Sequence, residues 1–303
     1  MDNELLLFDR IEVIKSANQK YDLESNAYLS FSGGKDSTIL HYLLDKALPN
    51  NNIPRVFIDT GIEYQLIREF VLKLAEQDKR FVIIKPSQPI KPMLERVGYP
   101  FKSKEHSLYL QQYQKNGMSK TAERYLNPSE KRKAYGCPAN LRYQFTKEFN
   151  LKVSNRCCFE LKKIPVHKWQ KENNRTITIT GMRKEEGGTR NKLTCIITDD
   201  KGKVTHFHPL AVVNDEWENW LVERERESIA LCPLYCQPYN FKRTGCAGCP
   251  YNLNLQEDLE TMERLLPNER RRCELIWKPV YEEYRRIGYR LKSYSQINLL
   301  EED

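Results

Sequence analysis

Apolar runs and helical patterns alternate along the first part of the chain. The predicted helices cover residues 4–21, 38–46 and 64–79, and the predicted strands cover 28–31, 54–59 and 80–85. The helices have apolar side chains at intervals of three or four residues, whereas each strand is a short apolar run. This alternation predicts βαβ units, which build a parallel sheet with helices on both faces.

The alternation stops at residues 86–150, where an irregular stretch with several prolines leads into a polar helical pattern. The next predicted strand of the sheet covers residues 176–180. Two alternating runs, 192–198 and 203–208, then flank the turn Asp199–Gly202 and predict a β-hairpin. We therefore predict an α/β fold with a mainly parallel, doubly wound sheet.

Two further helical patterns, 254–265 and 268–287, follow a stretch that is rich in cysteine. We expect a first domain over residues 1–210, with a basic helical insertion at about 100–150. A cysteine-rich and helical region over 211–303 is expected to pack on this domain.

Composition and charge narrow the class of protein only slightly. The chain has 303 residues, of which 40% are hydrophobic and 30% charged, and its net charge is +8. No apolar stretch approaches the roughly 20 residues of a membrane span. The acidic start of the chain lacks the basic residues of a signal peptide. We expect a cytoplasmic protein without a membrane segment, in which nine cysteines indicate metal ligands or reactive thiols rather than disulfides.

A polar loop joins the first predicted strand to the helix that follows it. It consists of Ser32, Gly33, Gly34, Lys35, Asp36 and Ser37. The two glycines let backbone N–H groups close on an oxyanion, and the positive end of the new helix points at the same place. Lys35 adds a cation, and the serines add hydroxyl donors. The loop is not a Walker A sequence, because Leu29 and Asp36 stand where that motif needs Gly and Ser or Thr.

A second polar motif, Asp59 to Glu63, follows the predicted strand 54–59. Ligands of parallel sheets bind beyond the carboxyl ends of the strands. We therefore expect Ser32–Ser37 and Asp59–Glu63 to face one pocket.

The insertion combines basic and aromatic residues. Between Lys102 and Lys133 there are eight Lys or Arg against three Glu, together with Tyr109, Tyr113 and Tyr125. Such a mixture suits a flexible polyanion, since rings stack on bases while cations meet phosphates. A solvated helical insertion with buried tyrosines explains the same pattern equally well.

Four motifs, which stand in the family's order, resemble the phosphoadenosine phosphosulfate (PAPS) reductase family of the PP-loop, adenine nucleotide α-hydrolase superfamily. They are Ser-Gly-Gly-Lys-Asp-Ser at 32–37, Asp-Thr-Gly-x-Glu at 59–63, Gly-x-Arg-x-x-Glu-x-x-x-Arg at 181–190, and Cys-Cys at 157–158 with Gly-Cys-Ala-Gly-Cys-Pro at 245–250. The resemblance covers roughly residues 25–255 and implies a five-stranded parallel sheet that binds ATP or a related adenine nucleotide.

The resemblance also implies roles for individual residues. Asp36 would hold Mg²⁺ or order the loop, Asp59 would lie near the nucleotide or the metal, and Arg183 and Arg190 would meet phosphate or an anionic substrate. The nucleotide-binding residues that it implies are Ser32, Gly33, Gly34, Lys35, Asp36, Ser37, Asp59, Thr60, Gly61, Glu63, Gly181, Arg183 and Arg190.

Two departures from the reductases of this family favour ATP chemistry. Reductases usually lack a lysine in the loop, whereas Lys35 is present here and can neutralise charge on a departing pyrophosphate. Reductases also resemble one another in a C-terminal Glu-Cys-Gly-x-His, which this chain does not contain; its last cysteine is Cys273. The sequence is more similar to members that activate a substrate with ATP.

We therefore predict an ATP-cleaving, pyrophosphate-releasing enzyme that adenylates an acceptor for sulfur transfer, with Lys35, Asp36 and Asp59 as catalytic candidates. A PAPS or adenylylsulfate reductase and a non-catalytic nucleotide-binding subunit are the alternatives. A nucleic acid is one candidate acceptor, and a cysteine desulfurase or another carrier is a candidate sulfur donor. The sequence leaves open whether the chain forms a homodimer.

Cys246 and Cys249 form a Cys-x-x-Cys pair that can hold one metal ion or one edge of a cluster. Together with Cys157 and Cys158 they match the arrangement by which related adenylylsulfate reductases hold a [4Fe–4S] cluster, which is the assignment we favour. A local set that uses Cys232 and Cys236 instead would hold structural Zn²⁺ or equally a cluster, so these two cysteines stay open.

Overall fold

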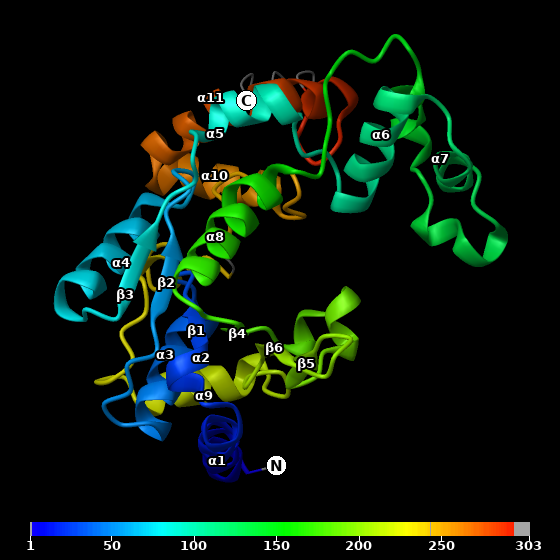
Figure 1. Cartoon of the computed structure of the whole chain (residues 1–303). Helices are drawn as coiled ribbons and strands as arrows, with labels where there is room; N and C mark the ends of the chain where they lie inside the picture. Colours follow the sequence, from blue (N-terminus) through cyan, green and yellow to red (C-terminus); the bar gives the residue numbers. More distant parts are fainter. Residues whose placement is uncertain (1, 243, 294–303) are drawn as a thin grey trace. The chain divides into compact units, whose positions relative to one another are not determined.

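The computed structural model describes residues 2–242 and 244–293 (Figure 1). It contains a six-stranded sheet with the strand order β3-β2-β1-β4-β6-β5. The strands are β1 (Ala27–Ser30), β2 (Arg55–Ile58), β3 (Phe81–Ile84), β4 (Ile177–Ile179), β5 (Ile196–Thr198) and β6 (Val204–Phe207). All neighbouring strands are parallel except β5, which is antiparallel to β6.

The prediction of an α/β fold with a mainly parallel sheet is confirmed. The strand count is six rather than five, because both arms of the predicted hairpin join the sheet. The tight turn at Asp199–Gly202 returns the chain beside itself, and such a return makes the edge strand β5 antiparallel.

Helices cover both faces of the sheet, as the sequence predicts. The ring of Phe31 contacts His41 of α3 with 6.2 Å between centroids, and the ring of Tyr28 contacts Trp169 of α8 at 5.3 Å. Side chains three residues apart in extended chain point to opposite faces, so α3 and α8 lie on different sides. The helices around the sheet are α1 (Asn3–Tyr21), α2 (Leu23–Asn26), α3 (Lys35–Ala47), α4 (Gln65–Gln77), α8 (Ile164–Glu172) and α9 (Asp215–Arg224).

The chain divides into two compact units whose segments alternate along the sequence. The first, here called the sheet unit, comprises Met1–Asp59, Tyr64–Lys85 and Pro165–Thr244. The second, the helical unit, comprises Thr60–Glu63, Pro86–Ile164 and Gly245–Asp303. This division does not coincide with the expected boundary at residue 210.

Three aromatic side chains of α11 organise part of the helical unit. Trp277 Nε1 donates to the carbonyl of Ala247 at 2.9 Å, Tyr284 Oη donates to that of Pro250 at 2.9 Å, and Tyr281 Oη donates to that of Gly248. The backbone of 247–250 is therefore anchored by α11. The helices of this unit are α5 (Ile90–Val97), α6 (Lys104–Asn116), α7 (Lys120–Leu126), α10 (Leu255–Leu265) and α11 (Pro267–Ile287).

The predicted insertion is helical, and part of its aromatic content forms a core. His106 lies between Tyr125 Oη, 2.9 Å from Nδ1, and Gln144 Oε1, 2.7 Å from Nε2. All three residues are buried, and Tyr109 packs on Tyr125 with ring centroids 4.9 Å apart. Tyr125 is therefore a packing residue. In the described part of the chain, no helix has the length and hydropathy that crossing a bilayer requires.

A buried arginine marks the start of β2. The side chain of Arg55 is 0% exposed, and its guanidinium donates to Asp45 Oδ1 at 2.6 Å and to Asn51 Oδ1 at 2.8 Å. Asp45 also accepts from Arg80 at 2.7 Å, so one carboxylate of α3 serves two cations. A buried guanidinium needs such a partner, because its desolvation is costly.

We predict that Asp45→Ala lowers the free energy of unfolding by about 3 kcal/mol, since it leaves Arg55 buried without its counter-charge. Urea unfolding at pH 7 measures the loss. Glu172→Ala is the matched control, because Glu172 pairs with Lys168 at 3.9 Å on the surface; it should change stability by less than about 0.5 kcal/mol. Equal effects of the two substitutions would contradict the prediction.

Candidate functional site

The loop Ser32–Ser37 presents the amino end of α3 from a glycine N-cap. Gly34 has no side chain and therefore makes no capping hydrogen bond to the N–H groups of the first turn. Inside the loop, Ser37 Oγ and Thr38 Oγ1 donate to the carbonyl of Gly34 at 2.9 and 3.0 Å, and Gly34 N donates to Ser32 Oγ at 3.2 Å. The serines therefore hold the turn, and the helix end keeps donors for an anion.

Two glycines permit close packing around this loop. Gly33 has a φ of +73°, and a Cβ there would lie 2.9 Å from the Cγ2 atoms of Ile67 and Val71 on α4. A Cβ at Gly181, after β4, would lie 2.9 Å from Asp36 Cβ. The missing side chain of Gly181 thus brings the 181–190 motif against the first turn of α3, within the sheet unit.

A cluster of charged side chains surrounds the first turn of α3. Lys35 Nζ lies 3.1 Å from Glu218 Oε2, and Arg183 Nε lies 3.4 Å from Glu218 Oε1. Arg183 Nη2 also lies 2.6 Å from Asp215 Oδ1 and 3.7 Å from Asp36 Oδ1. The tertiary structure therefore gathers Lys35, Asp36 and Arg183, which the sequence analysis selected, around two carboxylates of α9 that it did not select.

Glu218 is the main residue that sequence reasoning missed. Its side chain is 0% exposed, and burial raises the pKa of its carboxyl to about 7; Asp36 adds to the rise, while Arg183 and Lys35 oppose it. The signal was present in the helical pattern, because Glu218 shares the buried face of α9 with Trp217 and Leu221. A carboxylate on such a face indicates a buried cation partner.

Tyr235 is a second residue that the motifs did not reveal. Its hydroxyl bonds to Thr244 Oγ1 and receives the backbone N–H of Lys35, and burial raises the pKa of this phenol. A Cβ on Gly34 would lie 3.1 Å from Tyr235 Oη. The hydroxyl therefore lies at the end of α3 where an anion would bind. No local pattern signals this position, because the contact joins residues about 200 apart in sequence.

The other predicted nucleotide-binding residues make different contacts. Asp59 accepts from Arg68 Nε at 3.0 Å in the sheet unit. Thr60 and Glu63 belong to the helical unit, where the Glu63 carboxylate accepts from Thr60 N at 2.9 Å and from its hydroxyl. Gly61 adopts a φ of +79° in this turn. That Ser32–Ser37 and Asp59–Glu63 line one pocket remains a prediction.

Arg190 lies in the sheet unit at the end of the 181–190 motif. Its guanidinium pairs with Glu186, which also accepts from the backbone N–H of Arg183 at 3.4 Å. The side chain of Arg190 is 38% exposed, so it remains accessible to an anion.

The four cysteines of the predicted cluster all belong to the helical unit. Cys157 is buried, and Cys158, Cys246 and Cys249 are half-buried. A hydrogen bond from Cys157 lowers the pKa of Cys158 to about 6, with further lowering by nearby lysines, whereas burial raises the pKa of Cys249 to about 12. The thiols of both pairs act on the pKa of Cys157, so the pairs interact electrostatically.

Lys162 supplies a cation to this group of thiols. It donates a hydrogen bond to Cys246 Sγ, and its Nζ lies 3.7 Å from Glu63 Oε1. Negative charge on Cys246 Sγ raises the pKa of Lys162, whereas burial raises the pKa of the Cys246 thiol itself. Cys246 also forms a backbone bridge with Glu63.

The four thiols have the donor chemistry of a four-cysteine site, and they lie in one unit. Their side chains are not arranged as a closed site: over residues 2–242 and 244–293, no group of three or more His, Cys, Asp or Glu is placed to hold a metal ion. Cys232 and Cys236 belong to the sheet unit, the first buried and the second exposed.

The pKa of Glu218 predicts a pH dependence of stability. The folded chain holds the proton up to about pH 7, whereas the unfolded chain releases it near pH 4.5. The contribution of Glu218 to stability is therefore complete below about pH 4.5 and is lost as the pH rises through 7. Between these values, we expect the free energy of unfolding to fall on the order of 2–3 kcal/mol more in the wild type than in Glu218→Gln.

Urea unfolding at a series of pH values measures this difference. Glu216→Gln is the control, since it removes an exposed carboxylate from the same helix and should keep the wild-type slope. The same slope in Glu218→Gln and the wild type would show that Glu218 titrates as an ordinary carboxylate.

The chain is similar to several known proteins. An uncharacterized protein of Methanocaldococcus jannaschii is 24% identical over 232 residues, which are 75% of this chain and 42% of that protein, so the chain spans less than half of its relative's length. PAPS reductase from Candida auris, in a phosphate complex, is 16% identical with a TM-score of 0.47, covering 78% of this chain and 87% of the other.

Two further solved structures are similar at lower scores. FMN adenylyltransferase from Candida glabrata is 14% identical with a TM-score of 0.44, covering 80% of this chain and 62% of the other. NH3-dependent NAD synthetase from Campylobacter jejuni is 14% identical with a TM-score of 0.39, covering 95% and 96%.

The family comparison covers most of the sequence. The family model described as phosphoadenosine phosphosulfate reductase domain matches residues 26–129 and 118–252. This span includes the loop 32–37, the 181–190 motif and all four cysteines of the predicted cluster. The chain therefore belongs to the PAPS reductase domain family.

Proposed function

We propose that this protein is an enzyme that cleaves ATP between the α- and β-phosphates, adenylates an acceptor and releases pyrophosphate. The observation that carries the proposal is the amino end of α3, where Gly34 is the N-cap residue and Lys35 lies in the first turn. Backbone donors and a lysine at one helix end suit the phosphates of a nucleotide. An adenine nucleotide is the ligand class expected for a member of this family.

In the proposed reaction, a nucleophilic oxygen of the acceptor attacks the α-phosphorus of ATP. A bond forms between these atoms, and the bond from the α-phosphorus to the oxygen that bridges it to the β-phosphorus breaks with its electron pair. Pyrophosphate leaves, and the acceptor carries AMP. Lys35 would neutralise charge that grows on the leaving group, which is the electrostatic role expected of a preorganised cation.

The charge balance of the site favours a nucleotide that arrives with Mg²⁺. Lys35 and Arg183 face the carboxylates of Asp36, Asp215 and Glu218, so the cluster has no excess of positive charge for a polyphosphate. Asp36, with its side chain 33% exposed, is the candidate ligand, and Asp59 is the second. One or two carboxylates together with phosphate oxygens form the usual magnesium site in such enzymes. When bound, the ion would shield the charge of the phosphates.

We further propose Cys157, Cys158, Cys246 and Cys249 as the ligands of a [4Fe–4S] cluster, with Zn²⁺ as the alternative. When bound, the cluster would supply sulfur or redox chemistry for transfer to the adenylated acceptor, from which sulfur displaces AMP. Lys162 would balance the negative charge of the thiolates through its hydrogen bond to Cys246. A cysteine desulfurase or a similar carrier is the proposed sulfur donor.

The alternative of a thiol-dependent reductase lacks a suitable nucleophile near the end of the chain. Cys273 is 0% exposed and packs 3.9 Å from Met262 Sδ. Burial raises the pKa of its thiol to about 12, so the reactive thiolate is scarce at neutral pH. An accessible thiolate with a lowered pKa is what such a reaction needs, and the position of Cys273 disfavours it.

We predict that Lys35→Ala lowers the rate of pyrophosphate release from ATP on the order of 10²–10³-fold, because the charge of the leaving group loses its counter-ion. Asp36→Asn should act in the same direction through the bound Mg²⁺. A coupled pyrophosphate assay with cell extract as the source of acceptor measures both. Lys46→Ala removes an exposed lysine from the last turn of the same helix and should keep the wild-type rate.

Wild-type rates in Lys35→Ala and Asp36→Asn would reject the loop as the catalytic site. Sulfite formation from PAPS with thioredoxin would instead establish the reductase alternative. ATP binding without release of pyrophosphate or AMP would favour a non-catalytic nucleotide-binding subunit.

For the cysteines, we predict that protein purified without oxygen contains about four irons per chain and absorbs broadly near ~400 nm. Cys249→Ser should lose most of the iron, because a thiolate ligand is removed. Cys195→Ser is the control, since Cys195 is a half-buried thiol of the sheet unit, and it should keep the iron. Stoichiometric zinc in place of iron would contradict the cluster and leave a structural metal site.

A further inference from the structure

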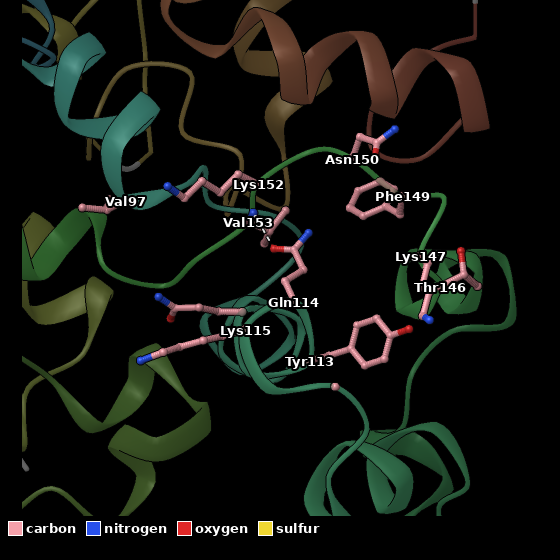
Figure 2. Close-up of a pocket in the computed structure, with 12 residues that line it drawn as sticks. Val97, Tyr113, Gln114, Lys115, Thr146, Lys147, Phe149, Asn150, Lys152 and Val153 are labelled. Atoms are coloured by element: carbon pink, nitrogen blue, oxygen red, sulfur yellow. Dashed lines mark hydrogen bonds between the residues drawn. The ribbon is translucent and has the colours of Figure 1, made fainter.

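The helical unit contains a hollow that the nucleotide site and the cysteines do not use. Its volume is about 680 Å³, which is within the range of pockets that bind small molecules. Figure 2 shows it between α6 and the segment 146–153. The lining residues that matter here are Tyr113, Gln114, Lys115, Lys147, Phe149 and Lys152.

The lining is positively charged. It contains three lysines and neither Asp nor Glu; Glu148, next to Lys147 in sequence, is not a lining residue. Lys115 and Lys147 are exposed, and neither forms an ion pair with a carboxylate among the described residues. Lys152 Nζ donates to the carbonyl of Arg96 at 2.6 Å, which neutralises none of its charge. The hollow therefore attracts an anion and offers it no competing carboxylate.

Two aromatic rings border the same hollow. Tyr113 packs against buried Phe145 with centroids 5.6 Å apart, and Phe149 packs edge-on against Tyr143 at 5.7 Å. In the view of Figure 2, these two rings and Lys147 lie on one side of Gln114, and Lys115 and Lys152 lie on the other. One side thus combines aromatic faces with a cation, and the other has two cations.

Gln114, which lies between these two sides, bonds through its side-chain amide to the backbone of the facing segment. Gln114 Nε2 donates to the carbonyl of Leu151 at 2.7 Å, and Gln114 Oε1 accepts from Val153 N at 3.1 Å. Both ends of the amide are occupied, so α6 is fastened to the segment 151–153. The rings and the lysines are therefore presented from a fixed backbone.

This combination points to a ligand that has both flat rings and repeated negative charges. A peptide with acidic side chains would use the lysines but not the aromatic faces. A base-paired duplex hides its base faces, whereas the unstacked bases of a single strand are free to stack on Tyr113 or Phe149 while the phosphates meet lysines. Nucleic-acid single strands are bound in this way by many proteins.

We propose that this hollow binds single-stranded nucleic acid, one or two nucleotides at a time. The inference deepens the proposed function, on which it rests for the reaction, by giving the class of the acceptor. The proposed binding site differs from the basic and aromatic region 102–133 that the sequence indicated. Tyr113 and Lys115 belong to that region, but Lys147, Phe149 and Lys152 follow it in sequence.

The test measures binding of fluorescein-labelled single strands of about ten nucleotides, DNA and RNA in separate arms, by fluorescence anisotropy without ATP. We expect the double substitution Lys115→Ala/Lys147→Ala to weaken binding and to reduce the slope of log affinity against log salt by about 1.4, since about 0.7 is lost for each phosphate contact of a single strand. Tyr113→Leu should weaken binding about 5- to 150-fold, because the base loses its stacking partner.

Matched variants separate the hollow from general charge and from misfolding. Tyr113→Phe keeps the ring and should keep the affinity. Lys120→Ala removes an exposed lysine of α7 that lies outside the hollow and should have little effect. Inorganic polyphosphate, which has charge without bases, should compete poorly.

The proposal fails if neither strand binds, if polyphosphate competes as well as the oligonucleotide, or if Lys120→Ala weakens binding as much as the double substitution. Preference for a duplex would also overturn it. Because the assay contains no ATP, its failure leaves Lys35-dependent pyrophosphate release untouched, and failure of that release leaves oligonucleotide binding untouched.

Discussion

The loop site depends on the ion pairs that the buried carboxylate of Glu218 forms with Lys35 and Arg183. Glu218 is 0% exposed, and the cations of Lys35 and Arg183 lie 3.1 and 3.4 Å from its two oxygens. A carboxylate out of water is tolerated only with such partners or with a proton. The packing of α9 against α3 is therefore compensated by these two cations or by a proton on Glu218. The same contact holds Lys35 beside the loop before any nucleotide is present.

Because of this contact, Lys35 and Arg183 are paired with carboxylates and are not unpaired positive charges. Lys35 and Arg183 already satisfy carboxylates, so a phosphate must compete for them with Asp215 and Glu218. The pKa of Glu218, about 7, means that a proton can take over part of this role near neutral pH.

In the helical unit, α11 holds the backbone around the Cys-x-x-Cys pair in place. Its aromatic side chains donate to the carbonyls of Ala247, Gly248 and Pro250, between and beside the Cys-x-x-Cys thiols. The backbone that carries Cys246 and Cys249 is therefore ordered by neutral hydrogen bonds to buried rings. Lys162, which precedes α8 in the chain, places a cation against the thiol of Cys246. Packing and electrostatics thus act on this pair of cysteines from separate elements.

The apolar pattern located the strands and the helices α1, α3 and α4, because a buried strand is a short apolar run and a helix on the sheet has an apolar repeat of about 3.6 residues. Both signals are local. The loop 32–37 and the Gly-x-Arg motif were visible for a similar reason, because each lies within ten consecutive residues. The aromatic content of the insertion was ambiguous. Tyr125 and Tyr113 look alike in sequence, but the first bonds to His106 in the core and the second borders a hollow.

The sequence by itself determined the class of fold and the family, since these rest on short-range spacing. Only the tertiary structure decided that Glu218 faces Lys35, that the hydroxyl of Tyr235 lies on the same helix end, and that Lys147 and Phe149 complete a hollow with Tyr113. The physical reason is separation along the chain. Charge and hydrogen-bond partners far apart in sequence meet only through packing, which no local pattern of residues encodes.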